Sequence, residues 1–328
     1  MPIFTTVNSQ TTFHLIKEEL TMKKLMSLVI AAASLMVILS GCGKPTLTVS
    51  NHHLSANALA VTLKGKSNQK QVDYTVNGGT KQTVKTNSGA FVISVPTKNY
   101  QQTVKLSTDG KHQTVTVAKA NVIGSYQKMR TTYNQGLTGA ALPKKDQQLA
   151  QSMAKQGAQL KKEAAELKAG KATSMAAMQA KAQKATALQK QAAELKQTQA
   201  KLAPAMKKAK ASVKDQLLPA NPKDGIHNLI DTNKMTLRVN LSGDKVLGIA
   251  MMVPVNNLKH KKDLKPFIMS FSILTNSVGA NAKHVLNKFQ KAAKAKKSSS
   301  TTAPKFHSNG LLFSLGYSTS TLYVFITK

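Results

Sequence analysis

The single cysteine of the chain, Cys42, follows a patterned N-terminal segment. Lys23-Lys24 precede an apolar run of about 15 residues at 25–39, and the small pair Ser40-Gly41 leads into the cysteine. A charged start, a short apolar stretch and small residues before a cleavage point make up an export signal peptide. The run is too short for a ~30 Å hydrocarbon core, which needs about 20 residues. The pattern predicts that residues 1–41 are removed.

The four residues Leu39-Ser40-Gly41-Cys42 resemble the lipobox of bacterial lipoproteins. In that family a diacylglyceryl group joins the cysteine thiol before cleavage, and the cysteine then becomes the N-terminus. The resemblance implies a protein held by its lipid at the extracellular face of the cell membrane, with Leu39, Ser40 and Gly41 recognised by the signal peptidase. The competing interpretation is a buried cysteine in an ordinary N-terminal helix. An acylated Cys42 leaves no thiol for a disulfide.

Residues 1–21 lie upstream of this pattern and fit a signal peptide poorly, because they include Lys17, Glu18 and Glu19. We therefore expect translation to start at Met22, with Met1 as the alternative.

The chain carries an unusually large positive charge. It has 47 Lys and Arg against 13 Asp and Glu, a formal net charge of +34. Removal of residues 1–41 takes away three lysines and two glutamates, so the exported part keeps about +33. Such a surface repels itself and attracts polyanions, which include nucleic acid, anionic lipid and anionic cell-wall polymer. Export makes nucleic acid an unsuitable partner.

The carboxylates give no pattern typical of an enzyme. Of the 11 that follow Cys42, four lie in a Lys-rich helical segment, where pairing along the helix explains them: Asp146, Glu163, Glu166 and Glu194. A glycosidase needs two cooperating carboxylates in a cleft. Turns and helix caps account more simply for the other candidates, Asp224, Asp231, Asp244 and Asp263.

Histidines and serines add no catalytic or metal-binding pattern. The seven histidines after Cys42 are scattered, and none has the spacing of a zinc site. His52-His53 are expected in a surface loop. Ser67 and Lys70 fit an SxxK pattern, but they fall in a turn and lack the companion motifs of penicillin-binding enzymes. We expect no catalytic residue, no metal and no cofactor.

Residues 46–122 are expected to form a small β-sandwich. Asn77-Gly78-Gly79 and Asp109-Gly110 are good hairpin turns, since their residues tolerate positive φ. In strand number and spacing the segment resembles the bacterial immunoglobulin-like modules of surface proteins. Residues 42–45 supply the lipidated cysteine and a short linker, so lysines of the sandwich could reach anionic headgroups. The expected strands are 47–50, 59–63, 72–76, 82–85, 91–95, 103–106 and 114–117.

Residues 144–214 have the composition of helices, rich in Ala, Lys and Gln. The segment 160–168 recurs at 188–196, an offset of 28 residues or four heptads. A Leu/Ala seam of this kind suits a close-packed hairpin or coiled coil, with a turn at Gly170-Lys171. One long helix, solvated or paired with another chain, is the alternative. The segment holds 16 lysines and four acidic residues, which fits a solvated face and also a protein partner.

Residues 223–328 are expected to form an α+β domain of order ββααββ, an antiparallel sheet with helices on one face. A breaker at 218–222 precedes it, and a polar connection at 298–304 follows its helices. The expected elements are strands 235–241, 246–253, 311–317 and 321–326 and helices 263–278 and 281–296.

The chain as a whole is thus expected to be a multidomain α+β protein, and two functions compete for it. The favoured hypothesis is a non-enzymatic envelope lipoprotein whose lysines bind anionic wall polymer or membrane lipid. The alternative is a ligand-binding or hydrolytic lipoprotein with a pocket in the C-terminal domain, ringed by groups such as His227, His260 or Tyr317. An adaptor that binds a protein partner through 144–214 is a third possibility. The simplest explanation of the positive charge is that it serves no specific partner.

Overall fold

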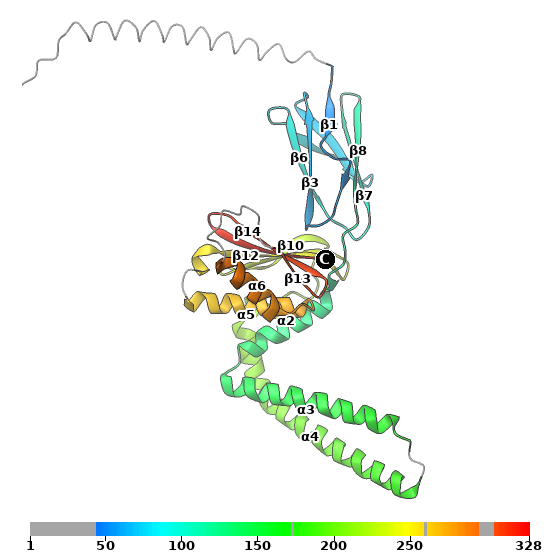
Figure 1. Ribbon diagram of the computed structural model, residues 1–328, viewed down its shortest axis with the longest axis vertical. Helices are drawn as coiled ribbons and strands as arrows, with labels where there is room; N and C mark the ends of the chain where they lie inside the picture. The colour runs from blue at the N-terminus through cyan, green and yellow to red at the C-terminus, as the bar shows by residue number, and fades with distance from the viewer. Residues whose placement is uncertain (1–43, 172–173, 259–260, 295–304) are drawn as a thin grey trace, which may run out of the picture. The chain divides into compact units, whose positions relative to one another are not determined.

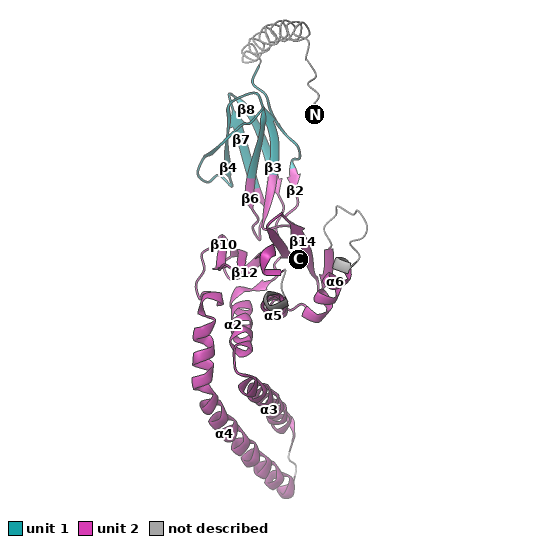
Figure 2. Cartoon of the chain, turned by 90° about the vertical axis from the view of Figure 1, so that its left-hand side faces the viewer, with its two compact units in different colours: residues 1–52, 63–93, 103–115 teal, residues 53–62, 94–102, 116–328 magenta. Residues whose placement is uncertain are grey.

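A computed structural model describes residues 44–328 except 172–173, 259–260 and 295–304 (Figure 1). It is an α+β structure with five α-helices and three mostly antiparallel sheets within those residues. The chain divides into two compact units (Figure 2). Of the described residues, unit 1 comprises 44–52, Leu63–Ile93 and Thr103–Val115, and unit 2 comprises His53–Thr62, Ser94–Gln102 and those within Thr116–Lys328.

Most of the strands between residues 47 and 117 run through unit 1. They form a three-stranded sheet of order β1-β3-β6 and a five-stranded sheet of order β2-β8-β7-β4-β5, in which β2 and β8 are parallel. All seven strands expected here are present, and β2 is an additional short one. The bounds are β1 Leu47–Val49, β2 His53–Leu54, β3 Ala60–Ser67, β4 Gln71–Val76, β5 Gln82–Lys85, β6 Ala90–Pro96, β7 Gln102–Thr108 and β8 Lys111–Val117.

Alternation of side chains builds the core of unit 1. Along the part of β3 that belongs to unit 1, Leu63, Gly65 and Ser67 are buried, while Lys64 and Lys66 between them are exposed. The expected turns have the backbone they require, since Asn77, Gly78, Asp109 and Gly110 all have positive φ. The alternation of buried residues and the residue types at the turns therefore both favour the observed strands.

Gly65 makes a close contact that any other residue would disturb. A Cβ placed on it would lie 2.2 Å from Phe91 Cζ and 2.5 Å from the carbonyl oxygen of Thr48. Phe91 is only 2% exposed, and its ring occupies the space beside the glycine on the neighbouring strand. The glycine thus makes room for the aromatic ring.

Unit 2 is built on a seven-stranded sheet of order β10-β11-β12-β15-β14-β13, with β9 paired to β12. The expected order ββααββ is not confirmed, because β10 and β13 add a strand at each edge and β9 precedes them all. The bounds are β9 Gly124–Ser125, β10 Gly225–Asp231, β11 Thr236–Ser242, β12 Lys245–Pro254, β13 Lys305–Ser308, β14 Leu311–Tyr317 and β15 Thr321–Thr327.

Three helices pack on the apolar residues of this sheet: α2 Tyr126–Ala140, α5 Lys261–Ser277 and α6 Ala282–Lys294. Leu237, Val239 and Ile249 of the sheet share one buried cluster with Phe271 of α5 and Val285 of α6. The helices α5 and α6 lie close to the expected 263–278 and 281–296.

Helix α2 was missing from the sequence prediction. Its residues Tyr126, Met129, Tyr133 and Leu137 are at most 2% exposed and belong to the same core as the sheet. The spacing of three and four residues is helical, and Ser125 caps the helix by accepting a hydrogen bond from the Lys128 N–H at 3.2 Å. The core of unit 2 therefore draws on residues both before and after the Lys-rich segment.

The Lys-rich segment forms two helices, α3 Lys144–Ala169 and α4 Met175–Ser212, which contact each other along their lengths (Figure 1). Helix α3 ends next to Gly170, as the sequence predicts, and a Cβ on Gly157 would lie 3.6 Å from Leu195 Cδ2. No residue of α3 is buried, and Leu160, Leu167, Leu188 and Leu195 remain partly exposed. Both helices belong to unit 2, and the expected domain boundaries 46–122, 144–214 and 223–328 stay a prediction.

Asn240 of β11 is a buried polar residue of unit 2. Its side chain is fully buried, and Nδ2 donates to the carbonyl oxygens of Leu59 and Thr97 and to Thr97 Oγ1, at 2.8–2.9 Å. The amide ties the segments 53–62 and 94–102 of unit 2 to β11. The two partner residues, Thr97 and Leu59, precede Asn240 in the sequence by 143 and 181 positions.

Candidate functional site

The expected lipidation site lies outside the described residues. This applies to Cys42 and to the neighbouring Leu39, Ser40 and Gly41. In the part of the chain that is described, no helix combines the length and the apolar character needed to cross a membrane.

The carboxylates that could have done chemistry serve turns and caps. Asp224 Oδ1 accepts a hydrogen bond from the Gly243 N–H at 2.8 Å, and Asp231 accepts the Thr236 hydroxyl proton at 2.7 Å. Asp244 Oδ1 accepts from the Gln127 N–H at 2.8 Å, at the start of α2. The side chain of Asp263 lies outside the described residues.

Two of these carboxyls have lowered pKa values. A hydrogen bond from the Thr236 side chain, and then one from Asn228, lowers the pKa of Asp231. A hydrogen bond from Ser125, and then one from the Gln127 backbone, lowers the pKa of Asp244. Both groups are ionised at neutral pH, whereas a general acid needs a raised pKa.

The residues proposed to ring a pocket do not surround one together. His227 Nε2 lies 2.8 Å from the carbonyl oxygen of Asp224, and Tyr317 is 53% exposed on its strand. His260 lies outside the described residues. A cavity of about 170 Å³ does open in unit 2, but neither His227 nor Tyr317 lines it.

The side chains of the remaining sequence motifs make local contacts with the backbone. Ser67 of the SxxK pattern is 2% exposed, and its Oγ accepts from the Gln69 N–H at 3.1 Å. His52 Nδ1 lies 2.9 Å from the carbonyl oxygen of Thr114. Within the described residues, no group of three or more His, Asp or Glu side chains is placed to hold a metal ion.

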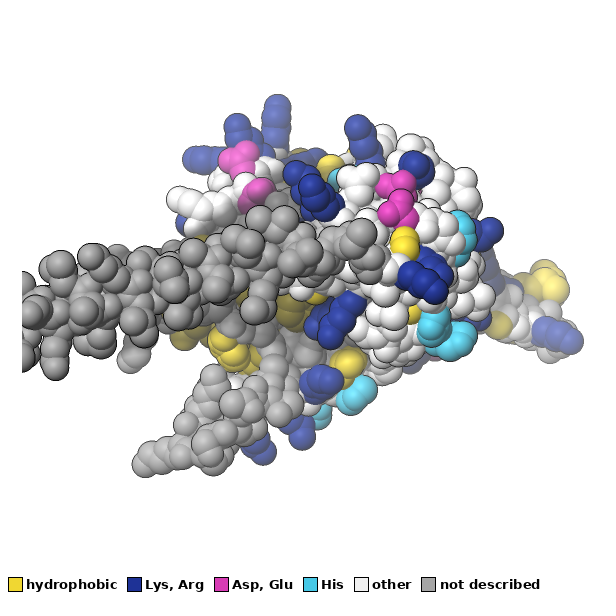
Figure 3. All heavy atoms as spheres, turned by 90° about the horizontal axis from the view of Figure 1, so that it is seen from above, with side chains coloured by type: hydrophobic (Ala, Val, Ile, Leu, Met, Phe, Trp, Pro, Cys, Tyr) yellow, Lys and Arg dark blue, Asp and Glu magenta, His cyan; other side chains and the backbone are white. Residues whose placement is uncertain are grey.

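The lysines form the broadest chemical feature of the surface. Among the described residues only two lysines pair with carboxylates: Lys81 Nζ lies 2.8 Å from Asp73, and Lys162 Nζ lies 3.9 Å from Glu166. The pKa of Asp73 is lowered first by the hydrogen bond from Lys81 and then by one from Thr83. Figure 3 shows Lys and Arg side chains spread over one face of the molecule, with few acidic groups beside them. Most of the described lysines are therefore available to an external anion.

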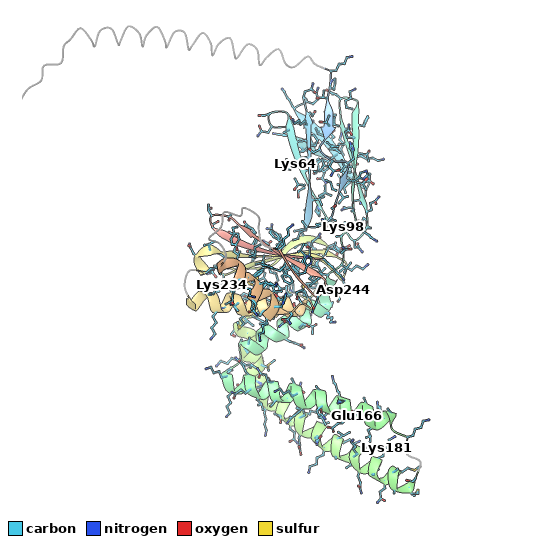
Figure 4. The ribbon with its side chains drawn as sticks, viewed as in Figure 1. Lys64, Lys98, Glu166, Lys181, Lys234 and Asp244 are labelled. Carbon is cyan, nitrogen blue, oxygen red and sulfur yellow. The ribbon has the colours of Figure 1, made fainter. Side chains whose placement is uncertain are left out.

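The two long helices distribute their charges unevenly. A groove between α3 and α4 is lined by Gln, Thr and Leu together with Glu163 and Glu194, and no described lysine lines it. Lysines such as Lys161, Lys168 and Lys196 are exposed elsewhere on the pair. Towards the turn, Lys181 Nζ donates to the carbonyl oxygen of Gly170 at 2.9 Å (Figure 4). The basic surface of the pair thus lies outside this groove.

Comparisons with known proteins give only partial matches. No protein-family model and no curated protein matches the chain. An FMN-binding beta-glucuronidase from Facaelibacterium prausnitzii L2-6 matches 24% of this chain over 12% of its own length, at 18% identity and a TM-score of 0.21. A beta-glucuronidase from Bacteroides uniformis matches 22% over 10% of its length, at 18% identity and a TM-score of 0.18. The chain spans about a tenth of these enzymes, and likenesses at this level carry no functional argument.

Proposed function

We propose that this chain is a non-enzymatic lipoprotein of the bacterial cell envelope, and that its lysines bind an anionic cell-wall polymer or lipid headgroups. The observation that carries the proposal is the lysine surplus: a chain of charge +34 has only two lysine–carboxylate pairs among its described residues. In the proposed topology, a lipid on Cys42 anchors the protein at the extracellular face of the membrane. The signal peptide would end with Leu39, Ser40 and Gly41.

The proposal assigns a part to each region. The strands of 46–122 would form an immunoglobulin-like sandwich near the membrane. The hairpin or coiled coil of α3 and α4 was expected to be a spacer before 223–328, but α2 and that region share one core. We therefore propose that α3 and α4 carry exposed lysines as part of unit 2 and do not separate two domains. Exposed lysines occur on the strands as well as on the helices; Lys64 of β3 is one example (Figure 4).

The energetics suit reversible attachment to a polyanion. A lysine close to an anionic surface contributes about 1 kcal/mol, so a few of them acting together give useful affinity. The attraction weakens as salt shortens the Debye length, which is about 3 Å at 1 M. Salt dependence is therefore the property that distinguishes this binding from recognition in a discrete pocket.

The test is a binding titration of residues 44–328, which hold the described parts of both compact units, against a lipoteichoic-type anionic polymer and neutral peptidoglycan. We expect binding to the anionic polymer alone, lost between about 50 mM and about 1 M salt. Salt-insensitive binding to either material, or no binding to both, would overturn the proposal.

Charge variants sharpen this test. Lys161→Gln, Lys168→Gln and Lys196→Gln together remove three exposed charges from α3 and α4, and should weaken binding by up to about a hundredfold at low salt. The opposite change, Glu163→Gln, should strengthen binding slightly because it removes a negative charge. If both variants change affinity in the same direction, the electrostatic explanation is wrong.

A further inference from the structure

The 170 Å³ cavity of unit 2 has an apolar floor next to α5. Met235, Met251 and Val253 supply the floor from the sheet and its preceding turn, and they are 5%, 1% and 1% exposed. Phe267 of α5 forms a wall and stacks on Phe271 with ring centroids 6.0 Å apart. Packing in the core therefore fixes the apolar floor of this cavity, whereas Asn233 and Lys234 line it from the turn before β11.

The polar lining of the same cavity includes groups without protein partners. Ser270 is 4% exposed and lines the cavity, yet its hydroxyl makes no hydrogen bond with any described residue. The side-chain amides of Gln216 and Asn233 are likewise unpaired within the described residues. A nearly buried hydroxyl normally has a partner, so the Ser270 hydroxyl points to a ligand or to water in the cavity. Asn233 is exposed and Gln216 is partly exposed, so their amides are available at the rim.

Asn257 is held in position at the rim. Its Nδ2 donates to the carbonyl oxygens of Asn233 and Lys234, at 3.0 and 3.2 Å. Its Oδ1 accepts no hydrogen bond from the described residues and is left as an oriented acceptor. Lys234 is the one charged residue of the described lining, and it is exposed (Figure 4). Donors and acceptors thus surround an apolar floor.

The size and lining restrict the ligand. A cavity of about 150 Å³ holds a molecule the size of benzene, whereas pockets for drug-sized ligands measure about 300–1,000 Å³. This cavity therefore takes one small group and leaves the remainder of a ligand outside. A methyl group fits the floor, and an amide that both donates and accepts fits Ser270, Gln216 and Asn257. The acetamido group combines these two properties.

We propose that this cavity binds the acetamido group of an N-acetylated amino sugar. The sugar ring would stay at the mouth, where the amide of Asn233 can reach its hydroxyls. The choice of a sugar, instead of another N-acetyl compound, rests on the envelope location proposed above. The binding itself does not depend on the lysine surface.

The test is an NMR titration of residues 44–328 with three probes at about 1 M salt, where lysine-dependent binding is screened. N-acetylglucosamine should bind with a dissociation constant on the order of a millimolar, because few atoms become buried. Glucose, which lacks the acetamido group, should bind at least tenfold more weakly. N-acetylalanine methylamide, which lacks the sugar, should also bind more weakly than the amino sugar.

Two variants of α5 form a matched pair. Ser270→Ala removes the unpaired hydroxyl and should weaken N-acetylglucosamine binding at least tenfold without lowering the melting temperature. Ser272→Ala is the control, because Ser272 Oγ donates to the carbonyl oxygen of Ile268 at 2.6 Å and does not line the cavity. Equal binding of glucose and N-acetylglucosamine, no sugar binding, or equal effects of the two variants would overturn the inference. Since the titration is made at high salt, failure here leaves the polyanion proposal to its own test.

Discussion

The close contact between Gly65 and Phe91 makes one residue decisive for unit 1. Gly65→Ala would place a methyl group against the Phe91 ring and the Thr48 carbonyl oxygen, each within 2.6 Å. Neither the backbone nor a ring that is 2% exposed can move away cheaply, so we expect a loss of about 1–3 kcal/mol in the free energy of unfolding. Urea unfolding of the variant measures it.

Gly124→Ala is the matched control for this prediction. A Cβ on Gly124 would meet nothing within 4 Å, and its φ lies outside the positive region. The control should change stability by less than about 0.5 kcal/mol. If both variants lose the same free energy of unfolding, the contact with the Phe91 ring is not what makes Gly65 necessary.

Long-range contacts of single residues were beyond the reach of sequence reasoning. Asn240 lies between the apolar residues Val239 and Leu241, and nothing in this local pattern indicates that it is buried by segments far away in the sequence. Ser270 and Asn257 were not singled out either, because nothing in their neighbourhood in the sequence distinguishes them. Both residues line a cavity whose walls come from parts of the chain that only the fold brings together.

Elements with a clear local period were predicted well. The strands up to residue 117 and the helices α5 and α6 follow from alternation and helical spacing, since these patterns act within a few residues. Helix α2 was missed although Tyr126, Met129 and Tyr133 have helical spacing, because the polar residues between them hid the pattern. The edge strand β13 was missed because its four residues include one apolar side chain, Phe306. The edge strand β10 was missed because its apolar residues, Ile226, Leu229 and Ile230, do not alternate.

The start of α2 gives a pH-dependent prediction. The pKa of Asp244 is lowered by hydrogen bonds from Ser125 and the Gln127 backbone, so its ionised form stabilises the fold. That contribution is present above the unfolded-state pKa, about 3.9, and disappears as pH falls through the lower folded-state value. Asp244→Asn should therefore destabilise the protein at pH 7, and its deficit relative to the parent chain should shrink near pH 3.

Chemical unfolding of both proteins across that pH range measures the deficit. Asp109→Asn is the control, because Asp109 lies in an exposed turn with positive φ, where asparagine is also tolerated. The control should show no such pH-dependent deficit. A deficit of Asp244→Asn that stays constant with pH would mean that the carboxylate charge is not the stabilising feature of this cap.

At the scale of the whole molecule, its charge should oppose its own folding. The formal net charge is +34, and the described residues contain two lysine–carboxylate pairs to offset it. Compaction brings the lysines closer together, so repulsion is greater in the folded chain than in the unfolded one. A protein stabilised by surface ion pairs behaves in the opposite way, because salt weakens those pairs.

We therefore expect the melting temperature of residues 44–328 to rise as sodium chloride increases from about 10 mM to about 200 mM, the range in which the Debye length shortens from about 30 Å to below 10 Å. Thermal unfolding followed by circular dichroism measures the shift. Lys161→Gln, Lys168→Gln and Lys196→Gln together should raise the melting temperature at low salt and reduce its salt dependence, since they remove part of the repulsion. The same variant is expected to lose affinity for the anionic polymer, so gain of stability and loss of binding should occur together. A melting temperature that falls with salt would show that attractive pairs dominate, and the lysines would then be engaged within the protein instead of available to a polyanion.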